Sequence, residues 1–167
     1  TGEKEIVLMH DDCYATATTK AKQYGVDVPF RPIHIIEYLR DQMLARKSDI
    51  KKLNMKIAYQ RPCASRYTPE KEPLLDELFS LIGAERVSRK YDRKDALCCA
   101  LPLIFRDMGR MQEIQAKNLD DAKNAGATAM IFLCPVCVRG LGAGAVERGM
   151  QVYMLSDLCR LALGETI

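Results

Sequence analysis

The sequence predicts an α/β fold, with an open, largely parallel sheet flanked by helices and an incomplete internal repeat. Two observations support this prediction. Short apolar runs of strand length alternate with longer segments of helical periodicity, which is typical of parallel strands joined by crossover helices. Glycine follows several of the helical segments, where it can take the left-handed conformation that ends a helix. The composition, 48% hydrophobic and 28% charged, is that of a globular protein.

The first third of the chain contains one strand–helix–extended–helix series. The apolar run EIVLM predicts a strand at residues 5–9, and a turn then leads to a helix at residues 13–24 that ends at Gly25. Residues 26–32 are expected to be extended. An amphipathic pattern predicts a helix at residues 34–46.

The middle of the chain continues the alternation. A strand is expected at residues 55–59 and a short strand at residues 86–89. Between them, residues 73–82 read as a helix, because proline begins the segment and Gly83 follows it.

The last part of the chain repeats the same order of elements. A long helical stretch, residues 104–125, is expected to be interrupted near Gly109. The elements expected after it are a buried strand at 128–133, a CPVC turn, a helix to 148, a strand at 151–155 and a last helix to 163.

An internal repeat connects the first and last parts. Residues 6–26 (IVLMHDDCYATATTKAKQYGV) parallel residues 130–150 (MIFLCPVCVRGLGAGAVERGM). In this alignment Cys13 matches Cys137, and His10 stands where Cys134 stands. Such self-similarity indicates two copies of one supersecondary unit.

Charge and hydropathy exclude two classes of function. The net charge of +3, without aromatic residues interleaved among basic ones, gives no nucleic-acid-binding pattern. The basic cluster at residues 86–94 is interpreted as a solvated surface or, alternatively, a docking surface for an acidic redox partner or an anionic thiol. The longest apolar run, residues 129–133, is far shorter than a membrane span, and no secretory pattern is present, so a cytoplasmic protein is expected.

Cysteine is the informative residue type. The seven cysteines are an odd number and include an adjacent pair, which fits a disulfide framework poorly. Cysteine clusters in a reducing compartment usually indicate metal or redox chemistry. Five of them form three groups separated by 34 residues each, and every group follows a predicted strand or lies in a turn. These are Cys63, Cys98, Cys99, Cys134 and Cys137.

The turns beyond the carboxyl ends of parallel strands gather at one crevice, so these five thiols are expected to meet. Thiolates are soft ligands that suit zinc, copper(I) and iron–sulfur clusters. Five thiolates exceed the four of a tetrahedral zinc site, which favours a multi-iron cluster and leaves a zinc-stabilised structural module as an alternative. A further alternative is a dithiol–disulfide oxidoreductase in which Cys134 and Cys137 cycle at a helix start.

The pattern Cys63, Cys98-Cys99, Cys134-x-x-Cys137 resembles the cysteine-rich CCG domain of the B-subunit family of heterodisulfide reductase. The same domain occurs in related iron–sulfur oxidoreductases, such as glycolate oxidase and anaerobic glycerol-3-phosphate dehydrogenase subunits. The flanking residues agree, because YQRPC resembles the family's HDPC-type approach and LCP its C-P-x-C turn. The resemblance covers roughly residues 55–167.

The resemblance implies that the five cysteines ligate a noncubane [4Fe-4S] cluster. It also implies reduction of a disulfide substrate, or electron transfer between protein partners; a disulfide or a thiol is the small molecule that such a site would meet. The electrons are expected to come from redox partner subunits, in a complex that is cytoplasmic or attached to a membrane-bound assembly. Two departures stand out: Ala100 replaces the glycine of the motif, and His10 replaces a cysteine in the first repeat, so a second complete cluster is not expected.

The resemblance also sets the expected domain boundaries. Residues 1–45 are interpreted as the closing half of a degenerate first CCG-like module, residues 46–54 as a linker, and residues 55–167 as the cysteine-rich domain.

Three further features carry expectations. His10 and Cys13 are interpreted as remnants held by hydrogen bonds at a helix start, with extra ligands as the alternative. Cys159 lies on an apolar helix face and is expected to be buried and inert. Three glycines at 140, 142 and 144 lower helix propensity, which indicates close approach of a neighbouring backbone or of the cluster.

Overall fold

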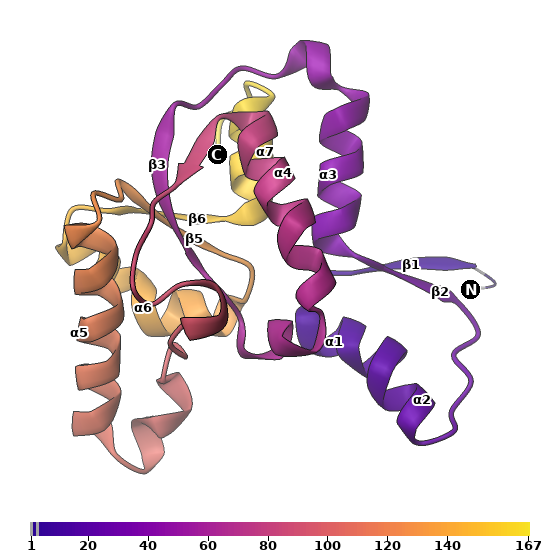
Figure 1. The fold of residues 1–167 in the computed structure, drawn as a ribbon, viewed down its shortest axis with the longest axis horizontal. Helices are drawn as coiled ribbons and strands as arrows, with labels where there is room; N and C mark the ends of the chain where they lie inside the picture. The colour runs from indigo at the N-terminus through magenta and orange to yellow at the C-terminus, as the bar shows by residue number, and fades with distance from the viewer. Residues whose placement is uncertain (1, 3) are drawn as a thin grey trace.

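The computed structural model describes residue 2 and residues 4–167, and it confirms the α/β class (Figure 1). The strands are β1 (Glu5–Leu8), β2 (Arg31–His34), β3 (Met55–Gln60), β4 (Ala84–Arg86), β5 (Ala129–Phe132) and β6 (Gln151–Met154). Every strand pair in the described part is parallel. The strands form two sheets instead of one: a pair, β1–β2, and a four-stranded sheet in the order β4-β3-β5-β6.

The helices connect these strands in chain order. They are α1 (Asp11–Ala15), α2 (Ala21–Gln23), α3 (Ile35–Ala45), α4 (Glu72–Ile82), α5 (Met108–Asn124), α6 (Pro135–Glu147) and α7 (Leu155–Ala162). A π-helical segment, Thr16–Lys20, joins α1 to α2. Short 3₁₀ segments lie at Cys63–Tyr67 and Leu101–Phe105. No helix in the described part of the chain has the length and apolar character needed to cross a bilayer.

The four-stranded sheet has a hydrophobic core on each face. Ile57 and Tyr59 of β3 point to the face covered by α4, α7 and α3. Ala58, between them, points to the opposite face, which α5 and α6 cover. This alternation is the period of two expected of a strand buried on both sides. Because α3 packs against α4, the N-terminal part is joined to the main sheet through its helix.

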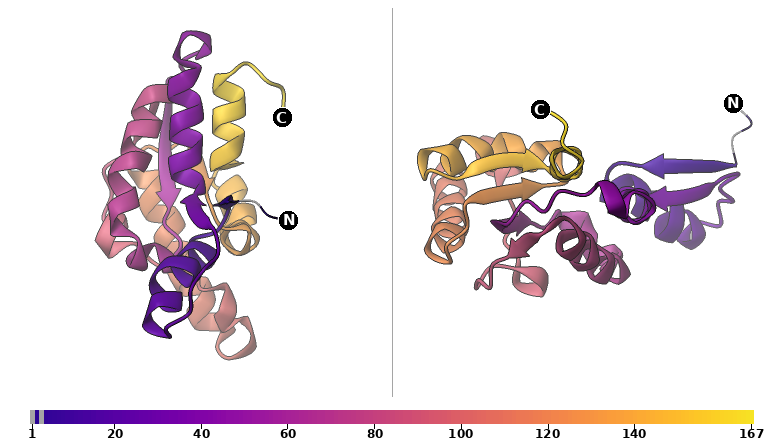
Figure 2. Two further views of the ribbon diagram at one scale, coloured as in Figure 1. Left: turned by 90° about the vertical axis from the view of Figure 1, so that its right-hand side faces the viewer. Right: turned by 90° about the horizontal axis from the view of Figure 1, so that it is seen from above.

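The internal repeat reappears as matching strand register. Leu8 of β1 stands opposite His34 of β2, and the equivalent Phe132 of β5 stands opposite Met154 of β6. Figure 2 shows the β1–β2 pair lying to one side of the larger sheet. Within the described residues, the second copy alone is extended by further strands, since β5 also pairs with β3.

Several element boundaries differ from the sequence prediction for local reasons. Helix α1 begins at Asp11, two residues early, because the His10 ring accepts the Asp12 amide at 3.2 Å and caps the helix. The short strand β4 lies at 84–86 and not at 86–89, since it follows Gly83 directly. Helix α5 begins at Met108, capped by Asp107, so the expected interruption comes before Gly109 and not at it.

Candidate functional site

The three cysteine segments lie at the same edge of the four-stranded sheet. Cys63 begins the 3₁₀ segment after β3, and Cys134 is the N-cap of α6 directly after β5. Since β3 and β5 are paired in parallel, their carboxyl ends are neighbours. Cys98 and Cys99 lie in the loop that follows β4 on the other side of β3.

The five thiols lie next to one another in a line. The Sγ atoms of Cys63 and Cys98 are 3.3 Å apart. Beyond this pair, Cys98 and Cys99 perturb each other's pKa, as do Cys99 and Cys137, and then Cys137 and Cys134, so each thiol is close to the next. The structure therefore brings together all five side chains that the sequence singled out.

The line runs from the surface into the core. Cys63 and Cys98, at one end, are exposed to solvent, whereas Cys99, Cys134 and Cys137 are buried. The Cys63–Cys98 end is therefore the part of the line that solvent reaches.

Interactions between neighbouring thiols lower the pKa of two members of the line, whereas the pKa of the other three is raised. The pKa of Cys98 lies far below the usual thiol range because it accepts hydrogen bonds from Cys63 and Cys99. Its neighbour Cys63 donates, and that bond together with burial raises the pKa of Cys63. At the other end, a hydrogen bond from Cys137 lowers the pKa of Cys134 to about 5. The two thiols favoured as thiolates are thus the first of the adjacent pair and the first of the CPVC turn.

The backbone after the adjacent cysteines is in a left-handed conformation. Ala100 has φ 57° and ψ 2°, and its amide donates to the Cys98 sulfur at 3.4 Å. Glycine adopts this conformation without the steric penalty that a Cβ brings. This explains why the CCG motif, which this sequence resembles, has glycine at the position of Ala100.

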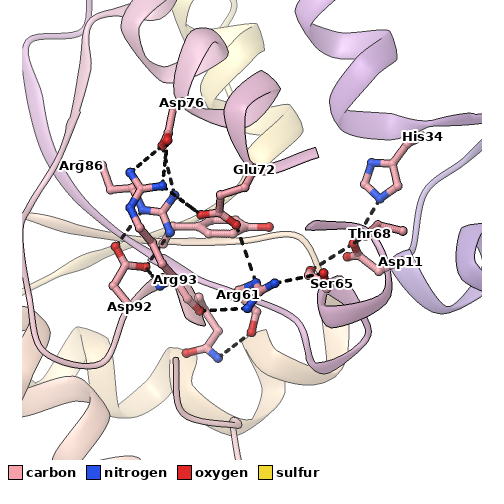
Figure 3. A network of polar contacts seen from close by, with 12 residues as sticks. Asp11, His34, Arg61, Ser65, Thr68, Glu72, Asp76, Arg86, Asp92 and Arg93 are labelled. Atoms are coloured by element: carbon pink, nitrogen blue, oxygen red, sulfur yellow. Dashed lines mark hydrogen bonds and ion pairs between the residues drawn. The ribbon is translucent and has the colours of Figure 1, made fainter. Parts of the chain in front are cut away.

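Arg61 ties two of the cysteine segments together (Figure 3). Its guanidinium donates to the Ser65 carbonyl at 3.0 Å, two residues after Cys63. It also donates to the Arg93 carbonyl at 2.9 Å, in the loop that leads to Cys98. Arg61 was not predicted as a site residue, although its place directly after β3 is a signal of site chemistry.

The basic cluster at 86–94 is only in part a solvated surface: the side chains of Lys90, Arg93 and Lys94 are exposed, whereas two arginines are buried. The side chains of Arg86 and Arg89 are 6% and 1% exposed. Burial disfavours the charge of Arg86, but hydrogen bonds to Asp92 and Glu72 outweigh it and raise the pKa of Arg86. Arg89 donates to the Tyr59 carbonyl at 2.8 Å and so links the loop to β3.

A pocket adjoins the exposed end of the thiol line. Its volume is about 250 Å³, and both Cys63 and Cys98 line it. Three cationic side chains line it as well and, among the residues that the structure describes, no acidic side chain does; the cations are Arg61, Arg66 and Lys94.

The remaining cysteines lie outside the thiol line. Cys13 is exposed and lines a separate, mostly apolar pocket between α1 and residues 26–30. Cys159 is buried on α7, as predicted, and burial raises its pKa to about 12.

His10 combines the predicted role with an additional contact. It caps α1, as expected of a residue held by local hydrogen bonds. It also lies close to Cys134, the residue that it matches in the repeat. Burial lowers the pKa of His10, but interaction with Cys134 and with the carboxylates of Asp12 and Asp11 outweighs burial and raises it.

The donor chemistry can be compared with what a metal group needs. In the described ranges, no three His, Cys, Asp or Glu side chains surround one point as ligands of a single metal ion. Five neighbouring thiols, supplied by three segments, nevertheless fit an iron–sulfur group, whose ligands are cysteine thiolates spread around several irons.

Comparison with known proteins identifies the class. The cysteine-rich domain family named CCG matches residues 57–142, about half of the chain, and the chain belongs to this family. A curated relative is the D-subunit of the dihydromethanophenazine:CoB--CoM heterodisulfide reductase of Methanosarcina barkeri. The two are 25% identical over 176 aligned positions, which cover 98% of this chain and 42% of the relative. The chain therefore spans less than half the length of that relative.

Proposed function

We propose that the five thiols hold an iron–sulfur cluster, a noncubane [4Fe-4S] group, and that the protein is a redox subunit of a multi-subunit oxidoreductase. The observation that carries the proposal is the convergence of five neighbouring thiols from three chain segments at one edge of the sheet. Family membership supports it, as does the similarity to a protein whose name states heterodisulfide reduction.

The ligands proposed are Cys63, Cys98, Cys99, Cys134 and Cys137. When bound, such a group supplies one-electron chemistry and an iron that a sulfur atom can approach. The chain's own contribution is access: Cys99, Cys134 and Cys137 are shielded, and the Cys63–Cys98 end opens into the pocket. Hydrogen bonds to the sulfurs, such as that from the Ala100 amide, tune the potential.

The pocket suggests the class of substrate. A disulfide or thiol with an anionic group would meet the cationic side chains of Arg61, Arg66 and Lys94 while its sulfur faces Cys63 and Cys98. Reducing one disulfide to two thiols takes two electrons and two protons. We infer that an electron-donating partner protein of the same complex supplies the electrons.

We also propose that residues 1–45 are the closing half of a degenerate CCG-like module, that residues 46–54 are a linker, and that residues 55–167 are the cysteine-rich domain. The matching strand register of the two copies supports this division.

Analysis of anaerobically purified protein tests the cluster directly. We expect a brown protein with absorbance at about 400 nm, and about four irons with matching acid-labile sulfide per chain. One zinc without sulfide would contradict the cluster and favour a structural zinc module. A metal-free protein that keeps all five thiols reactive would contradict both.

Cysteine variants separate ligands from bystanders. Cys98→Ala removes the thiol that joins the exposed and buried parts of the line, so we expect loss of most of the iron. Cys159→Ala is the matched control, because it removes a thiol that lies on α7 in the other core. Equal iron content in the two variants would overturn the proposed ligand set.

One observation favours a second candidate, a dithiol–disulfide oxidoreductase. Cys134 and Cys137 are in contact at the start of α6, and the pKa of Cys134 is lowered to about 5. This candidate requires a metal-free protein in which these two thiols form a reversible disulfide. Redox titration followed by peptide mapping of the Cys134–Cys137 bond decides between the two.

A further inference from the structure

A buried polar cluster joins the N-terminal unit to the segment that carries Cys63 (Figure 3). At its centre, Oδ1 of Asp11 accepts a hydrogen bond from Ser65 Oγ at 3.0 Å. It also accepts one from Thr68 Oγ1 at 3.4 Å. The third partner is His34, whose Nε2 lies 3.1 Å from the same oxygen. All four side chains are buried.

The hydrogen-bond pattern fixes the role of each group. Nδ1 of His34 accepts the amide of Ile36 at 3.2 Å, so in the neutral ring the proton is on Nε2 and is donated to Asp11. Asp11 is only 1% exposed, and a buried carboxylate is tolerated only where hydrogen bonds compensate its lost hydration. Displacing any donor is therefore costly, and the cluster holds its members in one arrangement.

The second carboxylate oxygen of Asp11 lies beside Tyr59 and a small cavity. Neither Asp11 Oδ2 nor the Tyr59 hydroxyl has a hydrogen-bond partner within the described part of the chain. Both residues line a cavity of about 10 Å³, the space of one water molecule. Tyr59 belongs to β3, the strand that leads to Cys63, so this side of Asp11 also adjoins the cysteine-bearing segment.

The position of the donors in the chain connects the cluster to the thiols. Ser65 lies two residues after Cys63 in the same 3₁₀ segment, and Thr68 follows directly after that segment. Cys63 itself is exposed and reaches Cys98 through a single sulfur contact of 3.3 Å. Its placement therefore depends on how its segment is anchored.

We propose that Asp11 is a positioning residue of the thiol site: through Ser65 and Thr68 it holds the Cys63 segment so that Cys63 stays within reach of Cys98. The N-terminal unit is then a working part of the site although it supplies no cysteine to the thiol line. The functional importance of Asp11 rests on the proposed cluster, but the geometry can be tested without iron.

Disulfide formation in the metal-free protein measures that geometry. The reduced chain is treated with diamide, and the rate at which the Cys63–Cys98 peptide bridge appears is followed by mass spectrometry. We expect Asp11→Ala to slow this rate at least about tenfold, since small misplacements of reacting groups cost one to two orders of magnitude. Asp12→Ala is the matched control: it removes a neighbouring carboxylate that is 59% exposed and should leave the rate unchanged.

A second set of variants acts from the cysteine side. The double variant Ser65→Ala/Thr68→Val removes two donors but keeps the Asp11–His34 pair, and it should slow bridge formation as well. Ser65→Thr keeps a hydroxyl donor and should react at close to the original rate. If Asp11→Ala does not fold by circular dichroism, the double variant decides.

Two results bear differently on the two proposals. A folded Asp11→Ala or double variant that bridges at the original rate would overturn the positioning role. Slowed bridging in these variants, together with an unmodified chain that takes up no iron, would uphold the positioning role and overturn the proposed cluster.

Discussion

The chain contains one structural unit twice, and the two copies differ in what they contribute. The N-terminal copy, β1 to α3, and the C-terminal copy, β5 to α7, share their element order and strand register. The C-terminal copy supplies Cys134 and Cys137 to the thiol line. The N-terminal copy has His10 and Cys13 at these positions, and its contacts with the site run through His10 and Asp11. One scaffold thus serves either to carry thiols or to position them.

The helix that follows the first strand of each copy packs differently in the two copies. In α6, a Cβ on Gly140 would lie 3.3 Å from the Cys99 carbonyl, and one on Gly144 would lie 2.7 Å from Leu119 Cδ1. The glycines therefore let α6 approach the cysteine loop and α5, which confirms the expected close approach. The N-terminal copy has Thr16, Thr18 and Lys20 at the equivalent positions, and there the helix widens into its π-helical segment.

The largest expected contrast between the copies is in metal retention. Cys137 and Cys13 are equivalent positions, but only Cys137 belongs to the thiol line. Changes outside the ligand set already reduce metal affinity about 10–100-fold, so Cys137→Ala should lose at least that much. Cys13→Ala should keep the iron and sulfide content of the unmodified chain. Iron and sulfide assays after anaerobic purification check both, and equal contents would remove the distinction between the copies.

The next contrast concerns the core. Leu141 of α6 is fully buried, and its equivalent in the first copy is Ala17. Leu141→Ala should lower the free energy of unfolding by about 2–5 kcal/mol, because it removes buried methyl groups and leaves a cavity. Val146→Ala on the same helix, where the side chain is 62% exposed, should change it by less than about 0.5 kcal/mol. Urea titrations of the two variants measure the difference.

Replacing glycines of α6 with alanine should change the stability of the protein less, and in opposite directions at two positions. Gly144→Ala places a methyl group against Leu119, so overpacking of about 1–3 kcal/mol should outweigh the gain in helix propensity. Gly142→Ala meets its nearest neighbour at 3.5 Å, an ordinary contact, and should stabilise the protein by about 1 kcal/mol. Opposite shifts in thermal unfolding are expected, and shifts of the same sign would show that α6 does not depend on close approach at Gly144.

The smallest expected effect is a pH dependence from α7. Burial raises the pKa of Cys159 to about 12, so the folded state keeps a proton that the unfolded chain loses above about pH 9. The stabilisation is complete below that pH and is lost as the pH rises toward 12. By pH 10 it has fallen by about 1.4 kcal/mol. Cys159→Ala should show a correspondingly flatter pH dependence of unfolding free energy, and identical slopes would contradict a buried thiol.

The sequence was sufficient for the features that depend on local pattern and parallel topology. The meeting of Cys63, Cys98 and Cys134 follows from strands whose carboxyl ends share an edge. The division into two sheets was not predictable, because apolar periodicity does not say which strands pair. Likewise, burial of Arg86 depends on acidic partners from a loop and a helix, and the Asp11–Ser65 contact joins residues 54 positions apart.

Ala100 shows that a residue can differ from the motif while the backbone keeps the conformation that glycine favours. Its left-handed backbone costs about 1–2 kcal/mol relative to glycine, which is small beside the 5–15 kcal/mol by which folded domains are usually stable. A protein with an ordinary stability margin therefore tolerates a change from glycine to alanine here. What the site requires at this position is a left-handed turn of the backbone after the adjacent cysteines. Glycine is the residue that adopts this turn with the least strain, but alanine can adopt it too.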